Sequence, residues 1–117
     1  MTDADMLCKG ISKDNPQFNI KKIYADAYQQ VTSSAGQRYP GVNSAINDRI
    51  QKGCLIFNYT GHGNESRMMA EYAVDAKTIE SWKNSTKLPF FIGAACNIAH
   101  FDYDGTSIGE KILLQKD

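Results

Sequence analysis

Two residue types that can carry covalent chemistry follow two apolar segments of the chain. His62 lies between two glycines in "LIFNYTGHGNE" (residues 55–65), and Cys96 directly follows "PFFIGAA" (residues 89–95). A cysteine thiol with a pKa of about 8.5 is mostly protonated near neutral pH, so a neighbouring histidine can stabilise the thiolate or remove the proton during attack. The pair therefore predicts a cysteine nucleophile with a histidine as its base.

The spacing of the two residues fits neighbouring strands of a parallel sheet. Residues 55–59 and 89–95 are predicted to form short buried strands, since aromatic and β-branched residues fit a pleated core surface. His62 and Cys96 are 34 positions apart, and one right-handed crossover takes ~30 residues or a little more. We expect adjacent parallel strands with both side chains at the carboxyl edge, where ligands bind in open α/β sheets.

Small residues beside the reactive pair leave room for the backbone of a substrate. Acyl transfer needs N–H donors aimed at the developing oxyanion, and a residue without a Cβ lets a carbonyl approach the main chain closely. We expect the N–H of Gly63 to be one donor and the N–H of Cys96 to be the second.

Each residue alone also has an ordinary structural explanation. A cysteine at the end of an apolar strand is often a small core residue, and a histidine in a glycine turn is often a polar surface residue. Their matched placement on successive strand ends, with small residues beside both, favours an active site.

Other candidates for the same chemistry are less well placed. Cys54 begins its strand, at the wrong edge of the sheet for catalysis, and Cys8 lies in a predicted helix, so both are expected to pack. His100 is a competing base in the same loop as Cys96, and we expect it to be a loop or pocket-wall residue. "FDYDGTS" (residues 101–107) is too short for the EF-hand spacing and predicts a turn and a helix cap.

The rest of the chain supplies the elements of an α/β fold. The alternation of strands and helices predicts a parallel sheet with helices on both faces. "TSSAGQRYPG" (residues 32–41) is predicted to be a loop, and Ile79 and Trp82 are expected to face the sheet. The other predicted elements are the end of a helix at residues 5–11, a strand from Phe18 to Tyr24, a helix with Val42, Ala45, Ile46 and Ile50 on one face that ends at Gly53, a helix from an Asp75 cap to Trp82, and a helix that starts at Thr106 or Ser107 and carries Ile108, Ile112 and Leu113.

Composition limits the remaining possibilities. The 117 residues suit one domain, and 13 basic and 13 acidic residues cancel without a basic stripe, which argues against nucleic acid or an anionic membrane surface as a partner. Three cysteines without a C-x-x-C pair encode neither a disulfide framework nor a zinc site. No segment predicts a membrane span or a targeting signal. Three clear strands are few for a parallel sheet, so we expect a partial domain.

The motifs around the pair resemble the gingipain family of cysteine peptidases, which have a caspase-like fold. The similarity rests on "NYTGHGNE" (58–65) and "LPFFIGAACNIAHFDY" (88–103) and extends through "GEKILL" (109–114). "YADAYQQV" (24–31) and "GQRYPGVNSAIN" (36–47) are most similar to the branch of C-terminal signal peptidases, or sortases, of the type IX secretion system. By this resemblance residues 1–117 correspond to the central part of the catalytic domain.

The resemblance also implies roles for individual residues. The family's base falls on His62 and its nucleophile on Cys96, and the oxyanion donors of caspase-like enzymes fall on the main chain of Gly63 and Cys96. An upstream acid orients the family's histidine, and here Asp3, Asp5 or Asp26 could serve.

One segment departs from the family pattern. After the Gly-His-Gly-x-Glu turn, relatives carry a small residue and then Trp-Ala, where this chain has "SRMMAEYAVD" (66–75). A substrate pocket with a different wall is therefore expected.

The resemblance implies an enzyme that acts on peptide or protein substrates without a cofactor or a metal. We expect a cysteine endopeptidase, with transpeptidase activity possible, that processes C-terminal signals of secreted proteins at the cell surface or outer membrane of a bacterium. The alternative is a non-catalytic caspase-like scaffold or binding module. Oligomeric state is not predicted.

Overall fold

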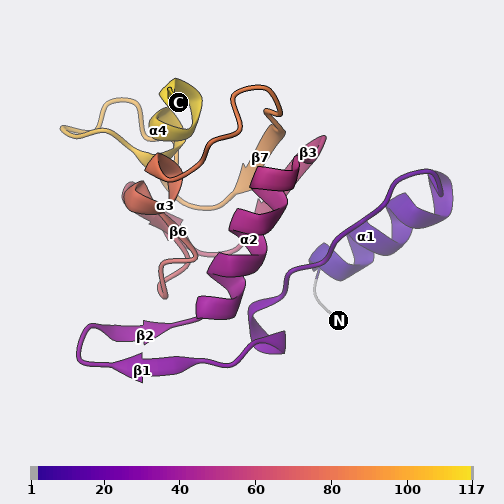
Figure 1. Ribbon diagram of the computed structural model, residues 1–117, viewed down its shortest axis with the longest axis horizontal. Coiled ribbons are helices and arrows are strands. Elements are labelled where there is room, and N and C mark those ends of the chain that lie inside the picture. Colours follow the sequence, from indigo (N-terminus) through magenta and orange to yellow (C-terminus); the bar gives the residue numbers. More distant parts are fainter. Residues whose placement is uncertain (1–2, 117) are drawn as a thin grey trace.

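The two strands expected to precede the reactive residues lie side by side. In the computed structural model, which describes residues 3–116, β3 (Ile56–Thr60) pairs in parallel with β7 (Phe90–Ala94). The register runs from Ile56 opposite Phe90 to Thr60 opposite Ala94, so the two strands end level with each other (Figure 1). This confirms the predicted adjacency and the α/β class of the fold.

The helix α2 (Pro40–Lys52) crosses from the N-terminal half of the chain to β3. Proline stands in its first turn, where its missing N–H costs no intrahelical hydrogen bond, and the helix ends at Gly53 with a φ of 91°. Val42, Ile46 and Ile50 are buried along one face. The predicted helix, its apolar face and its C-terminal glycine are therefore confirmed.

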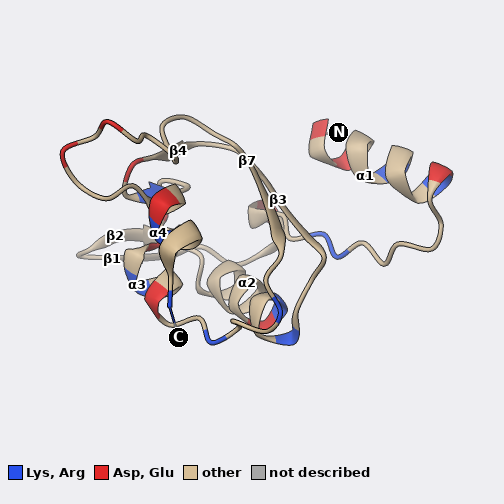
Figure 2. Ribbon diagram, turned by 90° about the horizontal axis from the view of Figure 1, so that it is seen from above, with Lys and Arg blue, Asp and Glu red and all other residues tan. Residues whose placement is uncertain are grey.

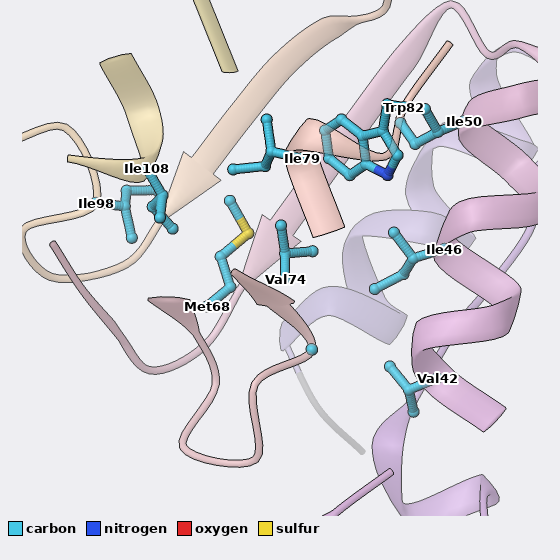
Figure 3. Packing of buried hydrophobic residues seen from close by; sticks show 10 residues of the cluster. Val42, Ile46, Ile50, Met68, Val74, Ile79, Trp82, Ile98 and Ile108 are labelled. Atoms are coloured by element: carbon cyan, nitrogen blue, oxygen red, sulfur yellow. The ribbon is translucent and has the colours of Figure 1, made fainter. Parts of the chain in front are cut away.

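Side chains from several elements form one apolar core (Figure 3). The α2 residues meet Met68, Val74 and Ile79, while Trp82 donates from its indole Nε1 to Asn47 Oδ1 at 2.8 Å. Phe57 and Phe91 lie beside this core and stack with ring centroids 4.8 Å apart. The core therefore ties the inward face of the parallel pair to the helices, as predicted for Ile79 and Trp82.

The helices that follow the strands have side-chain caps. Asp75 accepts the N–H of Thr78 at the start of α3 (Ala76–Glu80). Ser107 and Glu110 form a reciprocal capping box at the start of α4 (Ile108–Leu114). Ser107, one of the two predicted starting residues, is thus the cap of the last helix.

Between the histidine turn and α3 the chain forms a small antiparallel sheet. It consists of β4 (Gly63–Asn64), β5 (Arg67–Met68) and β6 (Val74–Asp75), in that order. The sequence did not predict this sheet, because strands of two residues are too short to show an alternating pattern.

Two expectations for the N-terminal region are wrong. The segment from Phe18 to Tyr24 has no strand and leads into a short 3-10 helix, η1 (Ala25–Ala27). Its apolar residues do not alternate consistently, so they do not define one face of a strand. Residues 32–41 are not simply a loop, because β1 (Val31–Ser33) and β2 (Gly36–Arg38) form a hairpin there.

The hairpin depends on its turn. The Ser33 hydroxyl oxygen accepts the N–H of Ala35 at 3.2 Å, and Gly36 has a φ of 98°, which a residue without a Cβ adopts readily.

The helix α1 (Asp3–Asp14) confirms a helix at the predicted residues 5–11 and lies to one side of the rest of the chain in both views (Figures 1 and 2). No helix within residues 3–116 combines the length and apolarity needed to cross a bilayer.

The strands are not buried as fully as their apolar sequences predict. Leu55 is 70% exposed, Ile56 51% and Phe90 69%, whereas Phe57 and Phe91 are half-buried against the core. Successive side chains point to opposite faces of a strand, so only one face of this pair meets the core. Leu113, in the last helix, is 77% exposed.

Candidate active site

His62 and Cys96 follow the level ends of the two parallel strands. Each lies two residues beyond the last register pair, Thr60 opposite Ala94. The N–H of Gly61 donates to the carbonyl of Ala94 at 3.2 Å, which fastens the histidine turn to the strand before the cysteine. Both reactive side chains are exposed. The structure therefore brings the two predicted residues to the same sheet edge.

The backbone of His62 is held by two donors. Its carbonyl accepts the N–H of Met69 at 2.8 Å and the hydroxyl of Tyr59 at 2.5 Å. Burial raises the pKa of the Tyr59 phenol, so this group keeps its proton and remains a donor. A Cβ on Gly61 would lie 2.8 Å from the Tyr59 oxygen. The first glycine of the turn thus makes room for the tyrosine that fixes the histidine.

The main chain at Gly63 has a defined orientation. Gly63 stands opposite Met68 in the β4–β5 pair, and the bond from Met69 N–H to the His62 carbonyl makes this a non-hydrogen-bonded pair. In such a pair the N–H points away from the partner strand, and β4 is an edge strand of its sheet. The Gly63 N–H therefore points away from β5 and is not used in the pairing of β4 with β5.

Ile98 packs between the two strand ends. A Cβ on Gly63 would lie 2.7 Å from Ile98 Cγ2, and a Cβ on Gly93 would overlap Ile98 Cδ1. The Ile98 carbonyl accepts the N–H of Gly109 at 2.6 Å. The two glycines thus leave room for the Ile98 side chain, a reason for small residues that the sequence does not reveal.

A carboxylate also joins the two loops. Glu65 Oε1 lies 2.9 Å from His100 Nδ1, and the Asn97 side chain hydrogen-bonds the same carboxylate. The Glu65 carbonyl accepts the N–H of Ile108 at 2.8 Å. Glu65 is part of the Gly-His-Gly-x-Glu motif, but its partners lie more than 30 residues further along the chain, so its role is visible only in the fold.

Both ring nitrogens of His100 face carboxylates, so this imidazole is not free to act as a base for Cys96. Its Nδ1 faces Glu65 and its Nε2 faces Asp102 Oδ1, both at 2.9 Å. The hydrogen bond with Glu65 is the main cause that raises the pKa of His100, and the same bond lowers the pKa of Glu65. The expected assignment of His100 to the loop is confirmed.

The acidic partner of His62 stays a prediction. The Asp5 carboxylate binds Lys22 Nζ at 2.6 Å and Lys9 Nζ at 3.0 Å, and these lysines lower its pKa to about 2. Asp26 lies in η1 and Asp3 begins α1. Within residues 3–116, the imidazole of His62 makes no hydrogen bond to a carboxylate.

A small hollow adjoins the histidine. Its volume is about 160 Å³, and it is lined by His62, Gly63, Asn64, Arg67, Met69 and Ala70. Three of these residues, Arg67, Met69 and Ala70, lie in the segment of residues 66–75. No group of residues in the described part of the chain could hold a metal ion.

The whole chain was compared with known proteins. The model of peptidase family C25 matches residues 2–117. The chain belongs to peptidase family C25. These are the gingipain-type cysteine peptidases, so the chain is a hydrolase of protein substrates at the level of its family. No curated protein and no solved structure gives a match.

The nucleophile of a cysteine peptidase must be accessible to substrate, so the exposure of each cysteine side chain bears on its role. Cys96 is exposed, whereas Cys8 in α1 and Cys54 before β3 are half-buried. Burial raises the pKa of the Cys54 thiol, which disfavours its thiolate. Cys96 is thus the cysteine of this chain that a substrate can approach most easily.

Proposed function

We propose that the chain is a cysteine endopeptidase in which Cys96 is the nucleophile and His62 is its base. The observation that supports this most strongly is the hydrogen bond from Gly61 N–H to the Ala94 carbonyl. It joins the two strand ends directly before the two reactive residues. The exposure of Cys96 and the family membership support the same roles.

The proposed reaction is an acyl transfer through a thioester. His62 takes the proton of the Cys96 thiol, and the sulfur forms a bond to the peptide carbonyl carbon while the carbonyl electron pair moves to oxygen. The main-chain N–H groups of Gly63 and Cys96 bind that oxyanion. When the oxyanion collapses, the C–N bond breaks and the leaving amine takes the proton from His62. Water then attacks the thioester, which releases a carboxylic acid and restores the thiol.

The acceptor and the substrate are finer proposals. An amine in place of water would make the same acyl-enzyme a transpeptidase. The similarity to type IX secretion sortases supports a C-terminal signal of secreted proteins as substrate, with the enzyme at the bacterial cell surface. It also supports a larger caspase-like catalytic domain of which residues 1–117 form the central part. Mass spectrometry of a protein with such a signal, incubated with and without a free amine, distinguishes hydrolysis from transfer.

A non-catalytic scaffold is the second candidate function. It is favoured by one observation, that within residues 3–116 no hydrogen bond joins the exposed side chains of His62 and Cys96. Catalytic hydrogen bonds often tighten only when substrate binds, so the peptidase remains the better proposal.

Selective thiol labelling tests the proposal. At mildly acidic pH, iodoacetamide should modify Cys96 faster than Cys8 or Cys54, and His62→Gln should slow the labelling of Cys96 by about tenfold or more. Peptide cleavage should be lost in Cys96→Ala and kept in the control Cys8→Ser. Equal, slow labelling of the three thiols together with no cleavage would overturn the proposal and favour the scaffold.

A further inference from the structure

The hollow beside His62 contains a cation that no carboxylate of the described chain neutralises. Arg67 lines this hollow and is half-buried at the start of β5. Within residues 3–116 its guanidinium has no ion pair and no hydrogen bond. A half-buried charge without a counter-ion is costly, so an anion that enters the hollow would be stabilised there.

Arg67 is held in place by an aromatic ring that a second arginine shares. The guanidinium carbon of Arg67 lies 4.2 Å from the centroid of the Tyr72 ring, and that of Arg38 lies 4.1 Å from the same centroid. The ring attracts each cation, but the two like charges repel each other. A carboxylate bound at Arg67 would relieve this repulsion.

The acidic residue on the neighbouring strand caps a helix and forms no ion pair with Arg67. Asp75 stands opposite Arg67 in the β5–β6 register. Its Oδ1 accepts the N–H and the hydroxyl of Thr78, both at 2.9 Å, in capping α3. The negative charge of Glu71 helps to raise the pKa of the Tyr59 phenol, and Glu71 forms no ion pair with Arg67. Arg67 is therefore the charged group of this hollow that remains available to a ligand.

The other walls limit what the ligand can be. The Asn64 side-chain oxygen is taken by the N–H groups of Ser66 and Arg67 and by the Ser66 hydroxyl. The His62 carbonyl already accepts two hydrogen bonds. Met69 and Ala70 give an apolar wall. A volume of about 160 Å³ suits one short side chain with an apolar stem and a negative end.

We propose that this hollow is a substrate subsite in which Arg67 binds an aspartate or glutamate side chain within two residues of the scissile bond. The inference rests on the proposed peptidase function and names its substrate class. Arg67 lies in "SRMMAEYAVD" (66–75), directly after the Gly-His-Gly-x-Glu turn that carries His62.

Peptide binding to the inactive variant Cys96→Ala tests the subsite separately from catalysis. The probes are pentapeptides with blocked ends, alanine at four positions and Asp, Glu, Asn, Gln or Arg at the centre. The acidic peptides should bind about tenfold or more tightly than their amide counterparts, and added salt should reduce the difference. Arg67→Gln in the same background should abolish this preference, while Arg67→Lys should keep part of it.

A matched control separates the specific cation from net charge. Lys21→Gln also removes one positive charge, at an exposed position outside the hollow, and it should leave the preference unchanged. The proposal is overturned if acidic and amide peptides bind equally, if no peptide binds at millimolar concentration, or if Arg67→Gln keeps the preference while its circular dichroism spectrum is unchanged.

The active chain distinguishes failure of the subsite from failure of the peptidase. Cleavage that depends on Cys96 but shows no acidic preference would overturn the subsite and leave the proposed function intact. Acidic preference in binding without any Cys96-dependent cleavage would support the subsite and overturn the peptidase. Both proposals are supported if kcat/KM for acidic peptides falls at least tenfold in Arg67→Gln and peptides cleave near the acidic residue.

Discussion

Glu65 and His100, which are 35 residues apart in sequence, meet at 2.9 Å and join the turn between β4 and β5 to the loop that follows β7. Glu65 lies three residues after His62, and the loop that follows β7 carries Cys96. Asp102 contacts the other nitrogen of the imidazole, but its side chain is 93% exposed, so we expect this second contact to contribute little. The Glu65–His100 pair therefore links the two segments that carry the candidate catalytic residues.

The first prediction is that this pair stabilises the fold within a defined pH window. The pKa of Glu65 lies below its ordinary value of 4.5, so its stabilisation is present above pH 4.5 and is lost as the pH falls through the lowered pKa. The pKa of His100 lies above its ordinary value of 6.5, so its stabilisation is present below pH 6.5 and is lost as the pH rises through the raised pKa. Glu65→Gln should lower Tm most between pH 4.5 and 6.5.

A control histidine makes this measurement specific. His100→Gln should reproduce the pH profile of Glu65→Gln, and the double variant should lose less stability than the sum of the two. His62→Gln removes an exposed imidazole that pairs with no carboxylate of residues 3–116, and its effect on Tm should not reproduce the Glu65→Gln profile. A Tm difference that is constant from pH 4 to pH 9 would contradict the assigned role of the pair.

The second prediction concerns the contact between Gly93 and Ile98. Gly93→Ala places a Cβ on top of Ile98 Cδ1, the movable end of that side chain, so it should cost about 1 kcal/mol of unfolding free energy, the low end for overpacking. Gly10→Ala is the matched control, because nothing lies within 4 Å of a Cβ at that helical position. It should be neutral or stabilising by up to about 1 kcal/mol.

A compensating substitution tests the cause of that loss. Ile98→Val removes Cδ1, so Gly93→Ala combined with Ile98→Val should be less destabilising than the sum of the single variants. Denaturant unfolding curves measure all four chains. Simple additivity would show that the assigned contact is not responsible.

The sequence predicted those parts of the fold that depend on local pattern. The helix with Val42, Ile46 and Ile50 on one face and the Asp75 and Ser107 caps follow from periodicity and side-chain chemistry within a few residues. The parallel pairing of β3 and β7 follows from apolar runs and crossover length. These features need no knowledge of distant contacts.

Features that depend on distant partners could not be predicted in the same way. The exposure of Ile56 and Phe90 depends on whether another element covers that face of the sheet, and apolar composition does not reveal this. The strand predicted from Phe18 to Tyr24 lacked a consistent alternation and did not form. In the candidate site, His62 and Cys96 were predictable as strand-end residues, whereas Ile98 and Glu65 act through residues that only the fold brings near.

The third prediction concerns the capping box at the start of α4. Ser107 is completely buried, and its hydroxyl and N–H both donate to Glu110 Oε2 at 2.8 Å. Ser107→Ala should lower the free energy of unfolding by about 1–2 kcal/mol, because it removes the side-chain cap and one of the hydrogen bonds to the half-buried Glu110 carboxylate. Thr106→Ala, next to the cap but outside the box, is the control. Equal urea midpoints for the two variants would contradict this role of Ser107.

The last prediction assigns a positioning role to Tyr59, whose hydroxyl donates to the His62 carbonyl at 2.5 Å. Tyr59→Phe keeps the ring and removes that donor. Of the two groups that donate to the His62 carbonyl, only the Met69 N–H then remains. The net stability loss should be about 1 kcal/mol. Misplacement of a base by a fraction of an ångström should slow iodoacetamide labelling of Cys96, and lower kcat more than it changes KM, by roughly tenfold.

The matched control for this variant is Tyr39→Phe. Tyr39 is also partly buried against the core, but its hydroxyl makes no hydrogen bond within residues 3–116, so its removal should change neither the labelling rate nor kcat. The two variants lose the same atom, and only one of them loses a contact with the histidine turn. If Tyr59→Phe loses stability but labels at the wild-type rate, Tyr59 supports the fold without positioning His62. The rigidity of the turn must then come from the Gly61–Ala94 hydrogen bond instead.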